Sequence, residues 1–289
     1  MIRVLKLGHE MKLYRYSTVA GRTLMRRFVA STRIKTEKGQ KRKEKANPTP
    51  EAVRKINLKN AIWTLCVLLN TYFKKGDQHI VLTYASEPGK KTAKKDLDKL
   101  IRNLRQHHKG TGCSFKWIAV TEYSHKRIHH HLVCSRTELE ILEKYWPHGW
   151  VTPKSLDATG NYIKLAEYLI KETEKTFRDD DSPNKVRYRR SRNMPMPAAQ
   201  REEVSDKELK NGPKEIDGYY IDRDTVHKYE HAILGVECMQ YIMVSLDKEP
   251  RLKRWYRGKV VKLEGEYKVR GEKQLTFDEL VCDAEGAEL

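Results

Sequence analysis

The chain has 289 residues, enough for one well-cored domain with extensions or for two small domains. Its 58 Lys and Arg residues against 39 Asp and Glu residues give a formal net charge of +19, more one-sided than solubility requires. This excess favours a nucleic acid partner. Anionic lipid is the alternative, but no apolar run approaches the ~20 residues that would cross a bilayer, so no membrane is expected.

The compartment is indicated by the amino terminus and the cysteines. Charged residues interrupt the apolar ones from Met1 to His9, unlike a secretory signal. The five cysteines are scattered, odd in number and never arranged as Cys-x-x-Cys. This pattern argues against a disulfide framework and against a cysteine zinc site. We therefore expect a cytoplasmic protein.

Residues 1–50 predict an irregular basic arm. Its basic residues gather between Arg33 and Lys45 with few apolar neighbours, which is typical of a segment that orders only on a partner. A leader without function is the alternative. The candidate DNA-binding residues of this segment are Lys35, Lys41, Arg42 and Lys43.

A series of regular elements follows the arm. Thr49 can cap a helix and Pro50 suits its first turn, and apolar positions then recur at helical spacing to about Phe73. The later patterns predict, in order, a strand at 79–84, a helix at 92–108, strands at 115–123 and 128–135 around a polar turn, a helix at 137–146, a short strand at 150–151 and a helix at 161–177. This order predicts an α+β fold with a central, largely antiparallel sheet and flanking helices.

The chain beyond Phe177 is first polar and basic, then β-rich. Short aromatic and β-branched runs return between Lys214 and Leu280, in an accessory region to which the sequence assigns no fold. We divide the chain into the basic arm (1–50), a central domain with a leading helix (51–178), and a basic linker with the accessory region (179–289). Candidate DNA-binding residues of the linker are Arg187, Arg189, Arg190 and Arg192, with solvated surface as the alternative.

Three consecutive histidines lie in the second strand of the predicted hairpin. Residues two apart in a strand share a face, so His129 and His131 point one way and His130 the other. If the turn is centred on residues 125–126, Glu122 lies directly opposite His129 and joins the two histidines on their face. Two imidazoles and a carboxylate form a three-ligand site with open positions, which suits Mn²⁺ or Mg²⁺, although zinc would also bind. A basic patch on DNA is the alternative, but Glu122 would oppose phosphate there.

The helix at 161–177 carries a candidate nucleophile. Tyr168 and Lys171 are three residues apart and so share a face, while the apolar residues between them would hold the helix against the sheet. A phenol of pKa ~10 needs a cation beside it to attack, and Lys171 or a bound metal could serve. Tyr162 lies about 240° round the helix from Tyr168, which favours a single nucleophile over a tyrosine pair.

The order of these motifs resembles the HUH endonuclease superfamily, with the strongest likeness to rolling-circle replication initiators of Gram-positive plasmids and phages. The resemblance covers about residues 50 to 197. It rests on Leu82-Thr83-Tyr84, the histidine triplet and Tyr168-Leu-Ile-Lys171, with supporting likeness at 76–84, 146–151, 165–172 and 191–195. One departure is His130, where the family usually has a bulky apolar residue; a slipped metal pair that includes His130 is therefore an alternative.

The resemblance implies that residues 51–178 contain an HUH-like endonuclease domain. His129, His131 and Glu122 would hold the metal, and Tyr168 would attack single-stranded origin DNA to leave a 5′-phosphotyrosine. No nucleotide-binding Gly-x-x-x-x-Gly-Lys-Ser/Thr motif occurs, so no fused helicase is expected and a host helicase is a candidate partner. A plasmid-mobilisation relaxase or a single-tyrosine transposase is the alternative of the same chemistry. A non-enzymatic nucleic-acid-binding protein with a structural metal is the alternative from another class.

Overall fold

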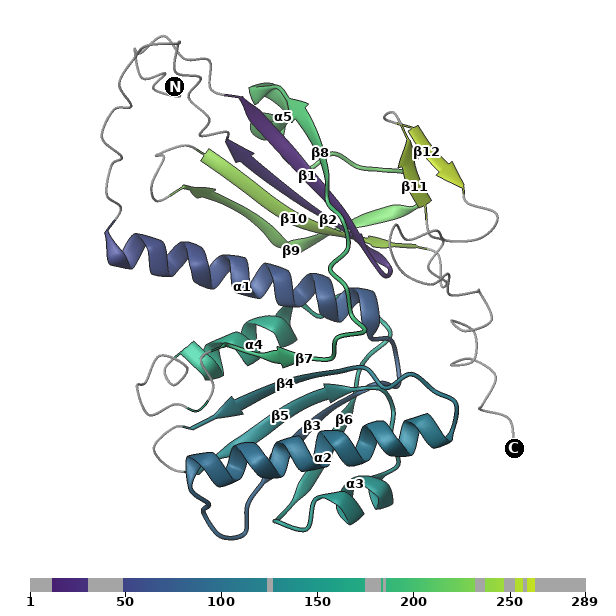
Figure 1. Ribbon diagram of the computed structural model, residues 1–289. Helices are drawn as coiled ribbons and strands as arrows, with labels where there is room; N and C mark the ends of the chain where they lie inside the picture. The colour runs from purple at the N-terminus through teal and green to yellow at the C-terminus, as the bar shows by residue number, and fades with distance from the viewer. Residues whose placement is uncertain are drawn as a thin grey trace, which may run out of the picture.

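The computed structural model describes residues 12–30, 49–123, 127–174, 183, 186–231 and 237–246, together with strands at 253–256 and 259–262. Within these residues the fold is α+β, with two five-stranded antiparallel sheets and five helices (Figure 1). The predicted fold class is therefore confirmed. No helix of the described part is both long enough and apolar enough to cross a membrane.

The first sheet, which we call the histidine sheet, contains the predicted hairpin. Its strand order is β6-β3-β5-β4-β7. Its strands are β3 (Gln78–Thr83), β4 (Trp117–Glu122), β5 (His129–Cys134), β6 (Val151–Ser155) and β7 (Arg189–Arg190). Strands β3, β4 and β5 agree with the sequence prediction within two residues at each end, whereas β6 is longer than the two residues expected. Pro153 fits within β6 because this is an edge strand, where one row of backbone groups is unpaired.

The second sheet, which we call the terminal sheet, joins strands from the two ends of the chain. Its order is β8-β1-β2-β10-β9. Its strands are β1 (Leu13–Ala20), β2 (Thr23–Ala30), β8 (Gln200–Val204), β9 (Tyr219–Glu230) and β10 (Glu237–Ser245). Two further strands, β11 (Lys253–Tyr256) and β12 (Lys259–Lys262), pair only with each other.

The predicted irregular arm is wrong for residues 13–30, which form the β1–β2 hairpin of the terminal sheet. The strands form there because Leu24, Met25 and Phe28 are completely or almost completely buried, and they reach these positions by pairing β2 with β10, more than 200 residues away. The basic residues between Arg33 and Lys45 lie outside the described residues. The division of the chain at residues 50 and 178 stays a prediction.

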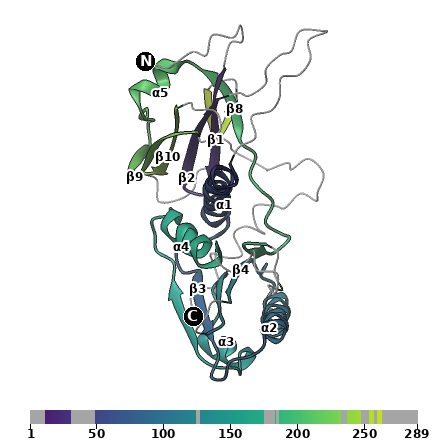
Figure 2. The same ribbon diagram turned by 90° about the vertical axis from the view of Figure 1, so that its left-hand side faces the viewer.

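Helices fill the space between the sheets and cover the far face of the histidine sheet. Helix α1 (Pro50–Tyr72) lies between the two sheets, and α4 (Ile163–Glu174) lies beside it (Figure 1). Helices α2 (Lys90–Gly110) and α3 (Leu139–Tyr145) pack on the opposite face of the histidine sheet, so that α4 and α2 flank this sheet from two sides (Figure 2). The short α5 (Asp206–Asn211) packs on the outer face of the terminal sheet through Leu209.

Helix α1 begins where the sequence predicts. The Thr49 side chain accepts a hydrogen bond from the Ala52 amide at 3.2 Å, and Pro50 occupies the first turn. The second half of the helix is buried almost all round, since one hydrophobic cluster joins it to both sheets and to α4. This cluster includes Met25 and Ile242 from the terminal sheet, Val120 and Val133 from the histidine sheet, and Leu169 and Ile170 from α4.

One buried side chain of α1 links three elements. The Asn70 amide nitrogen donates to the Thr23 hydroxyl at 3.0 Å, and its oxygen accepts from the Tyr162 amide at 2.9 Å. Gly21 turns the β1–β2 hairpin at φ +53°, and a Cβ there would lie 2.0 Å from the Asn70 carbonyl oxygen. The terminal sheet and α4 are therefore fixed to the same turn of α1.

Candidate metal centre and tyrosine

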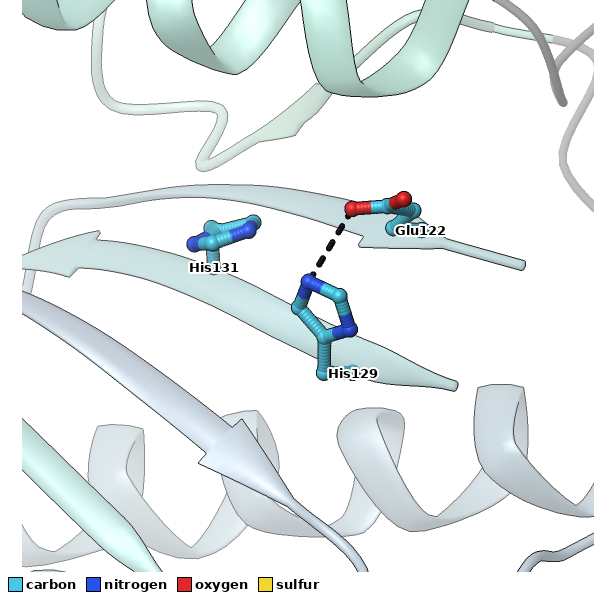
Figure 3. A group of neighbouring side chains, drawn as sticks. All are labelled: Glu122, His129 and His131. Carbon is cyan, nitrogen blue, oxygen red and sulfur yellow. Dashed lines mark ion pairs between the residues drawn. The ribbon is translucent and has the colours of Figure 1, made fainter. Parts of the chain in front are cut away.

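Glu122, His129 and His131 lie together on one face of the histidine sheet, as the strand alternation predicts. The register pairs Glu122 directly with His129 across β4 and β5. One ligand atom from each of the three residues lies within 4.8 Å of the other two, and Glu122 Oε2 is 3.0 Å from His129 Nε2 (Figure 3). The predicted hairpin register is confirmed, and it excludes the slipped pairing.

The chemistry of this group fits a divalent cation. His131 is 1% exposed, and its Nε2 is buried without a hydrogen-bond partner among the described residues. An unpaired buried nitrogen costs free energy, and a metal ion would satisfy it. Burial, followed by the charges of His79 and His129, lowers the pKa of His131 to about 3. The imidazole is therefore neutral, which is the form that binds metal.

His130 points to the other face and has a structural environment. Its Nδ1 is hydrogen-bonded to the Thr121 hydroxyl at 2.9 Å, and its Nε2 to the Tyr84 hydroxyl at 3.0 Å. The ring is completely buried beside Trp146, and burial lowers its pKa to about 3. A polar side chain can therefore stand where the resembling family has an apolar one, because both ring nitrogens have partners.

Tyr168 lies at the edge of the metal centre. The neighbouring Leu169 and Ile170 are buried in the cluster around α1 and hold α4 in place, while Tyr168 itself remains 42% exposed. Its ring meets His131 edge-on, with 5.2 Å between ring centroids. A partly exposed phenol thus lies beside a three-ligand group on a rigid helix, as a nucleophile would.

The comparisons with known proteins agree with this geometry. Residues 77–177 match the family model of replication-associated protein ORF2. This segment, which we call the replication-associated domain, is about a third of the chain and holds the three candidate ligands and Tyr168. No curated protein and no solved structure matches the chain significantly.

The electrostatic surroundings of Tyr168 in the replication-associated domain oppose ionisation. Burial raises the pKa of Tyr168, and the nearby carboxylates of Glu172 and Glu122 raise it further. The side chain of Lys171, predicted to assist the phenolate, lies in the exposed part of α4. A phenolate at this position therefore needs a cation close to the two carboxylates.

Tyr162 belongs to the core rather than to the site. It is 4% exposed and lies just before α4, where its hydroxyl donates to the Asp157 carbonyl at 3.1 Å. Burial raises its pKa above the ordinary value. The two tyrosines have different surroundings, in keeping with the prediction of a single nucleophile.

The four predicted linker arginines fall into two groups. Arg187 forms an ion pair with Glu174 of α4, and Arg189 forms one with Asp98 of α2. Arg190 and Arg192 are exposed, although the Arg190 guanidinium also donates to the Met194 carbonyl. The first pair thus ties the linker to the replication-associated domain. Lys35, Lys41, Arg42 and Lys43 lie outside the described residues, and DNA binding by all eight stays a prediction.

Sequence reasoning missed His79, which contacts the site from β3. Its ring stacks on His131 with 5.3 Å between centroids, and it meets Tyr168 edge-on at 6.2 Å. Burial lowers the pKa of His79 to about 4, so this ring is also neutral. The alternation of β3 could have placed His79 on one face with Val81, but only the pairing of Val81 with His131 shows that this is the metal face.

Proposed function

We propose that this chain is a rolling-circle replication initiator that nicks and rejoins single-stranded origin DNA, with Tyr168 as the nucleophile. The observation that carries the proposal is the packing of the partly exposed Tyr168 ring against His131, within a domain that matches a replication-associated family. The charge of +19 supports DNA as the partner.

Glu122, His129 and His131 would hold Mn²⁺ or Mg²⁺. Three ligands leave coordination positions for water and for phosphate oxygens, which suits these ions. A bound ion would polarise an oxygen of the scissile phosphate as a Lewis acid. The carboxylate of Glu122 distinguishes this group from a purely imidazole site and adds negative charge for the cation.

Tyr168 then exchanges one phosphate ester for another. Its phenolic oxygen forms a bond to phosphorus while the bond from phosphorus to the 3′-oxygen breaks. The phenol proton passes to solvent, and the departing 3′-oxygen takes a proton from solvent. The 5′-phosphotyrosine conserves the ester bond energy, so attack by a free 3′-hydroxyl reverses the step and rejoins the strands without ATP.

The protein holds Tyr168 protonated until the site is charged for reaction. Glu122 and Glu172 raise its pKa, and the charge of Glu122 is offset when this side chain ligates a cation. Lys171 shares the exposed part of α4 and adds positive charge near the phosphate. Nicking is therefore coupled to occupation of the metal centre.

The decisive experiment is detection of the covalent adduct. A labelled oligonucleotide that contains the cognate origin, incubated with the protein and Mn²⁺, should give a protein–DNA band that survives denaturation. Tyr168→Phe removes only the attacking oxygen, so the band should vanish while DNA binding remains. Tyr162→Phe is the matched control and should keep the band, because this hydroxyl faces the core.

Mapping of the adduct decides between the functions. A phosphotyrosyl peptide that contains another tyrosine would contradict the assignment to Tyr168. Absence of any adduct over candidate origins would instead favour a non-enzymatic DNA-binding protein with a structural metal. A relaxase or transposase would give the same adduct at a transfer origin or at an element end, so the cleaved sequence separates these functions.

A further inference from the structure

His79 makes the one side-chain contact that reaches the inner nitrogen of a candidate ligand in the described site. Its Nε2 lies 3.2 Å from His131 Nδ1, within hydrogen-bond range. His79 is half-buried at the start of β3, and its ring stacks nearly parallel to His131, with 28° between the planes. Two neutral imidazoles at this distance need one proton between the two nitrogens.

The position of that proton decides whether His131 can bind metal. If His131 Nδ1–H donates to His79 Nε2, then His131 Nε2 carries a lone pair. That is the buried nitrogen without a partner among the described residues. If His79 donates instead, His131 must carry its own proton on Nε2, which buries an N–H with no acceptor and removes the ligand. Only the first arrangement satisfies both nitrogens when a metal is bound.

We propose that His79 is a positioning residue that accepts a hydrogen bond from His131 Nδ1 and so fixes the tautomer in which Nε2 is a metal ligand. The proposal rests on the metal centre of the proposed function. His79 also meets the Tyr168 ring edge-on, so the same imidazole lies against both the ligand and the nucleophile. Loss of His79 frees both rings to turn.

The test compares two substitutions of similar size. His79→Gln keeps an oxygen that can accept the hydrogen bond, whereas His79→Leu does not. Mn²⁺ affinity measured by calorimetry should fall about 10- to 100-fold for His79→Leu and largely recover for His79→Gln. His148→Ala is the control, because this histidine packs against Tyr84 and Trp146, both of which belong to the hydrophobic cluster under the other face of the sheet.

A second readout does not depend on metal. Nitrogen-15 NMR of the metal-free protein should show His131 protonated at Nδ1, and His79→Leu should shift or mix the tautomers. Equal Mn²⁺ affinity in wild type and His79→Leu, or a wild-type His131 protonated at Nε2, would overturn the role of His79. A wild-type protein that binds no Mn²⁺ would instead overturn the metal centre, while the tautomer would still report on His79.

A different observation concerns edge strand β6, whose exposed side chains point to the metal face. Lys154 pairs with His79 and Thr152 with Val81, and directly opposed residues share a face. The Thr83 amide donates to the Trp150 carbonyl at 3.0 Å, which continues the same register by one more pair. Trp150, Thr152 and Lys154 therefore form a row on the metal face, which we call the β6 row.

Trp150 has the chemistry of a stacking platform. Its side chain is 62% exposed, an unusual state for the largest apolar residue. Thr83 pairs with both Trp150 and His129, so the indole lies two strands from a candidate ligand, at about 10 Å by strand spacing. An exposed aromatic followed along the strand by a cation matches the alternation of base and phosphate in a single strand.

The geometry points to the β6 row as the place where single-stranded DNA lies beside the reacting phosphate, with a base stacked on Trp150 and a phosphate near Lys154. Four strand residues separate the two side chains by about 13 Å, which spans about two nucleotides. This inference rests on the proposed function, and it names the contact that holds its substrate.

Binding is measured without divalent metal, so that no chemistry intervenes. Fluorescence anisotropy of a labelled single-stranded oligonucleotide should show roughly 10-fold weaker binding for Trp150→Ala and little change for Trp150→Tyr. Tyr220→Ala is the matched control, since this tyrosine is 47% exposed but lies on β9 of the terminal sheet. At saturating DNA, Trp150→Ala should still form the Tyr168 adduct.

The outcomes separate this inference from the function. Equal affinity of the Trp150→Ala and Tyr220→Ala variants would overturn the stacking role and leave nicking at Tyr168 intact. Wild-type protein that binds no single-stranded DNA would overturn the proposed function itself. Weaker binding of Trp150→Ala to a double-stranded oligonucleotide, but not to a single strand, would also contradict a stacked base.

Discussion

The two faces of β5 give its three consecutive histidines different tasks. His129 and His131 share the open metal face with Glu122, whereas His130 is hydrogen-bonded on both sides within the opposite layer. Only alternation of the strand separates these roles, since the side chains are chemically identical. The contrast leads to different expectations for the same substitution at neighbouring positions.

We expect Glu122→Ala, His129→Ala and His131→Ala each to abolish or strongly weaken Mn²⁺ binding with modest loss of stability. His130→Ala should retain Mn²⁺ binding but lower the free energy of unfolding by about 2–4 kcal/mol, because it leaves a cavity and unpaired hydroxyls on Tyr84 and Thr121. Calorimetric titration and urea unfolding of the four variants measure both effects. Loss of metal binding in His130→Ala at full stability would contradict this assignment.

The buried histidines also predict how stability depends on pH. The folded-state pKa of His130 is about 3, well below the ordinary value near 6.5, so the unfolded chain binds the proton more tightly. The stabilisation is fully present above about pH 6.5 and is lost as the pH falls toward 3. We expect the metal-free protein to be less stable at pH 5 than at pH 7, by on the order of 2 kcal/mol from this residue.

Urea unfolding at the two pH values measures that difference. His130→Leu cannot titrate at this position, so its stability should change less between pH 7 and pH 5 than that of the wild type. An unchanged difference would assign the pH dependence to other groups.

At the scale of elements, the loop before β6 controls the open edge of the histidine sheet. A Cβ on Gly149 would lie 2.3 Å from the Thr83 carbonyl oxygen, a contact that backbone cannot relieve without moving. The Trp146 indole also donates to this carbonyl at 3.1 Å. The end of β3 and the loop that carries Trp150 are thus fitted to each other.

Gly149→Ala should therefore destabilise the protein by about 2 kcal/mol or more and shift Trp150, with weaker binding of single-stranded DNA. Gly110→Ala at the end of α2 is the matched control, because a Cβ there meets nothing within 4 Å. Thermal unfolding and DNA anisotropy compare the two variants. Equal stability of both would mean that the loop adapts at no cost.

The elements recovered from sequence are those defined by local signals. Thr49 and Pro50 mark the start of α1, and the symmetry of the hairpin places Glu122 opposite His129 without any knowledge of the rest of the sheet. His79 and the β1–β2 hairpin were missed because their meaning depends on pairings distant in sequence. The contact between His79 and His131 spans 52 residues, and β2 pairs with β10.

At the scale of the whole molecule, the replication-associated domain does not contain its own complete core. Val120 and Val133 of the histidine sheet, together with Leu169 of α4, share one cluster with Trp63 and Leu69 of α1. Helix α1 ends before residue 77, where the family match begins. Without α1, the apolar side of this domain would face water.

We expect a fragment of residues 77–177 to unfold without a cooperative transition and to bind the dye ANS, as partly packed states do. A fragment that starts at residue 49 and extends through Met194 restores the α1 contacts and should unfold more cooperatively. Calorimetry and near-ultraviolet circular dichroism compare the two. A sharp transition for the shorter fragment would show that α1 is dispensable for its core.

The strand order of the terminal sheet has a consequence for biosynthesis. The β1–β2 hairpin emerges from the ribosome first, yet its neighbours on either side, β8 and β10, follow about 180 or more residues later. Until then both edges of the hairpin carry unpaired backbone groups, which invite pairing with other chains. Translation that stalls after α4 would therefore release a chain that has the candidate nucleophile and metal ligands but is prone to aggregate. Only completed synthesis supplies the strands that cover both edges.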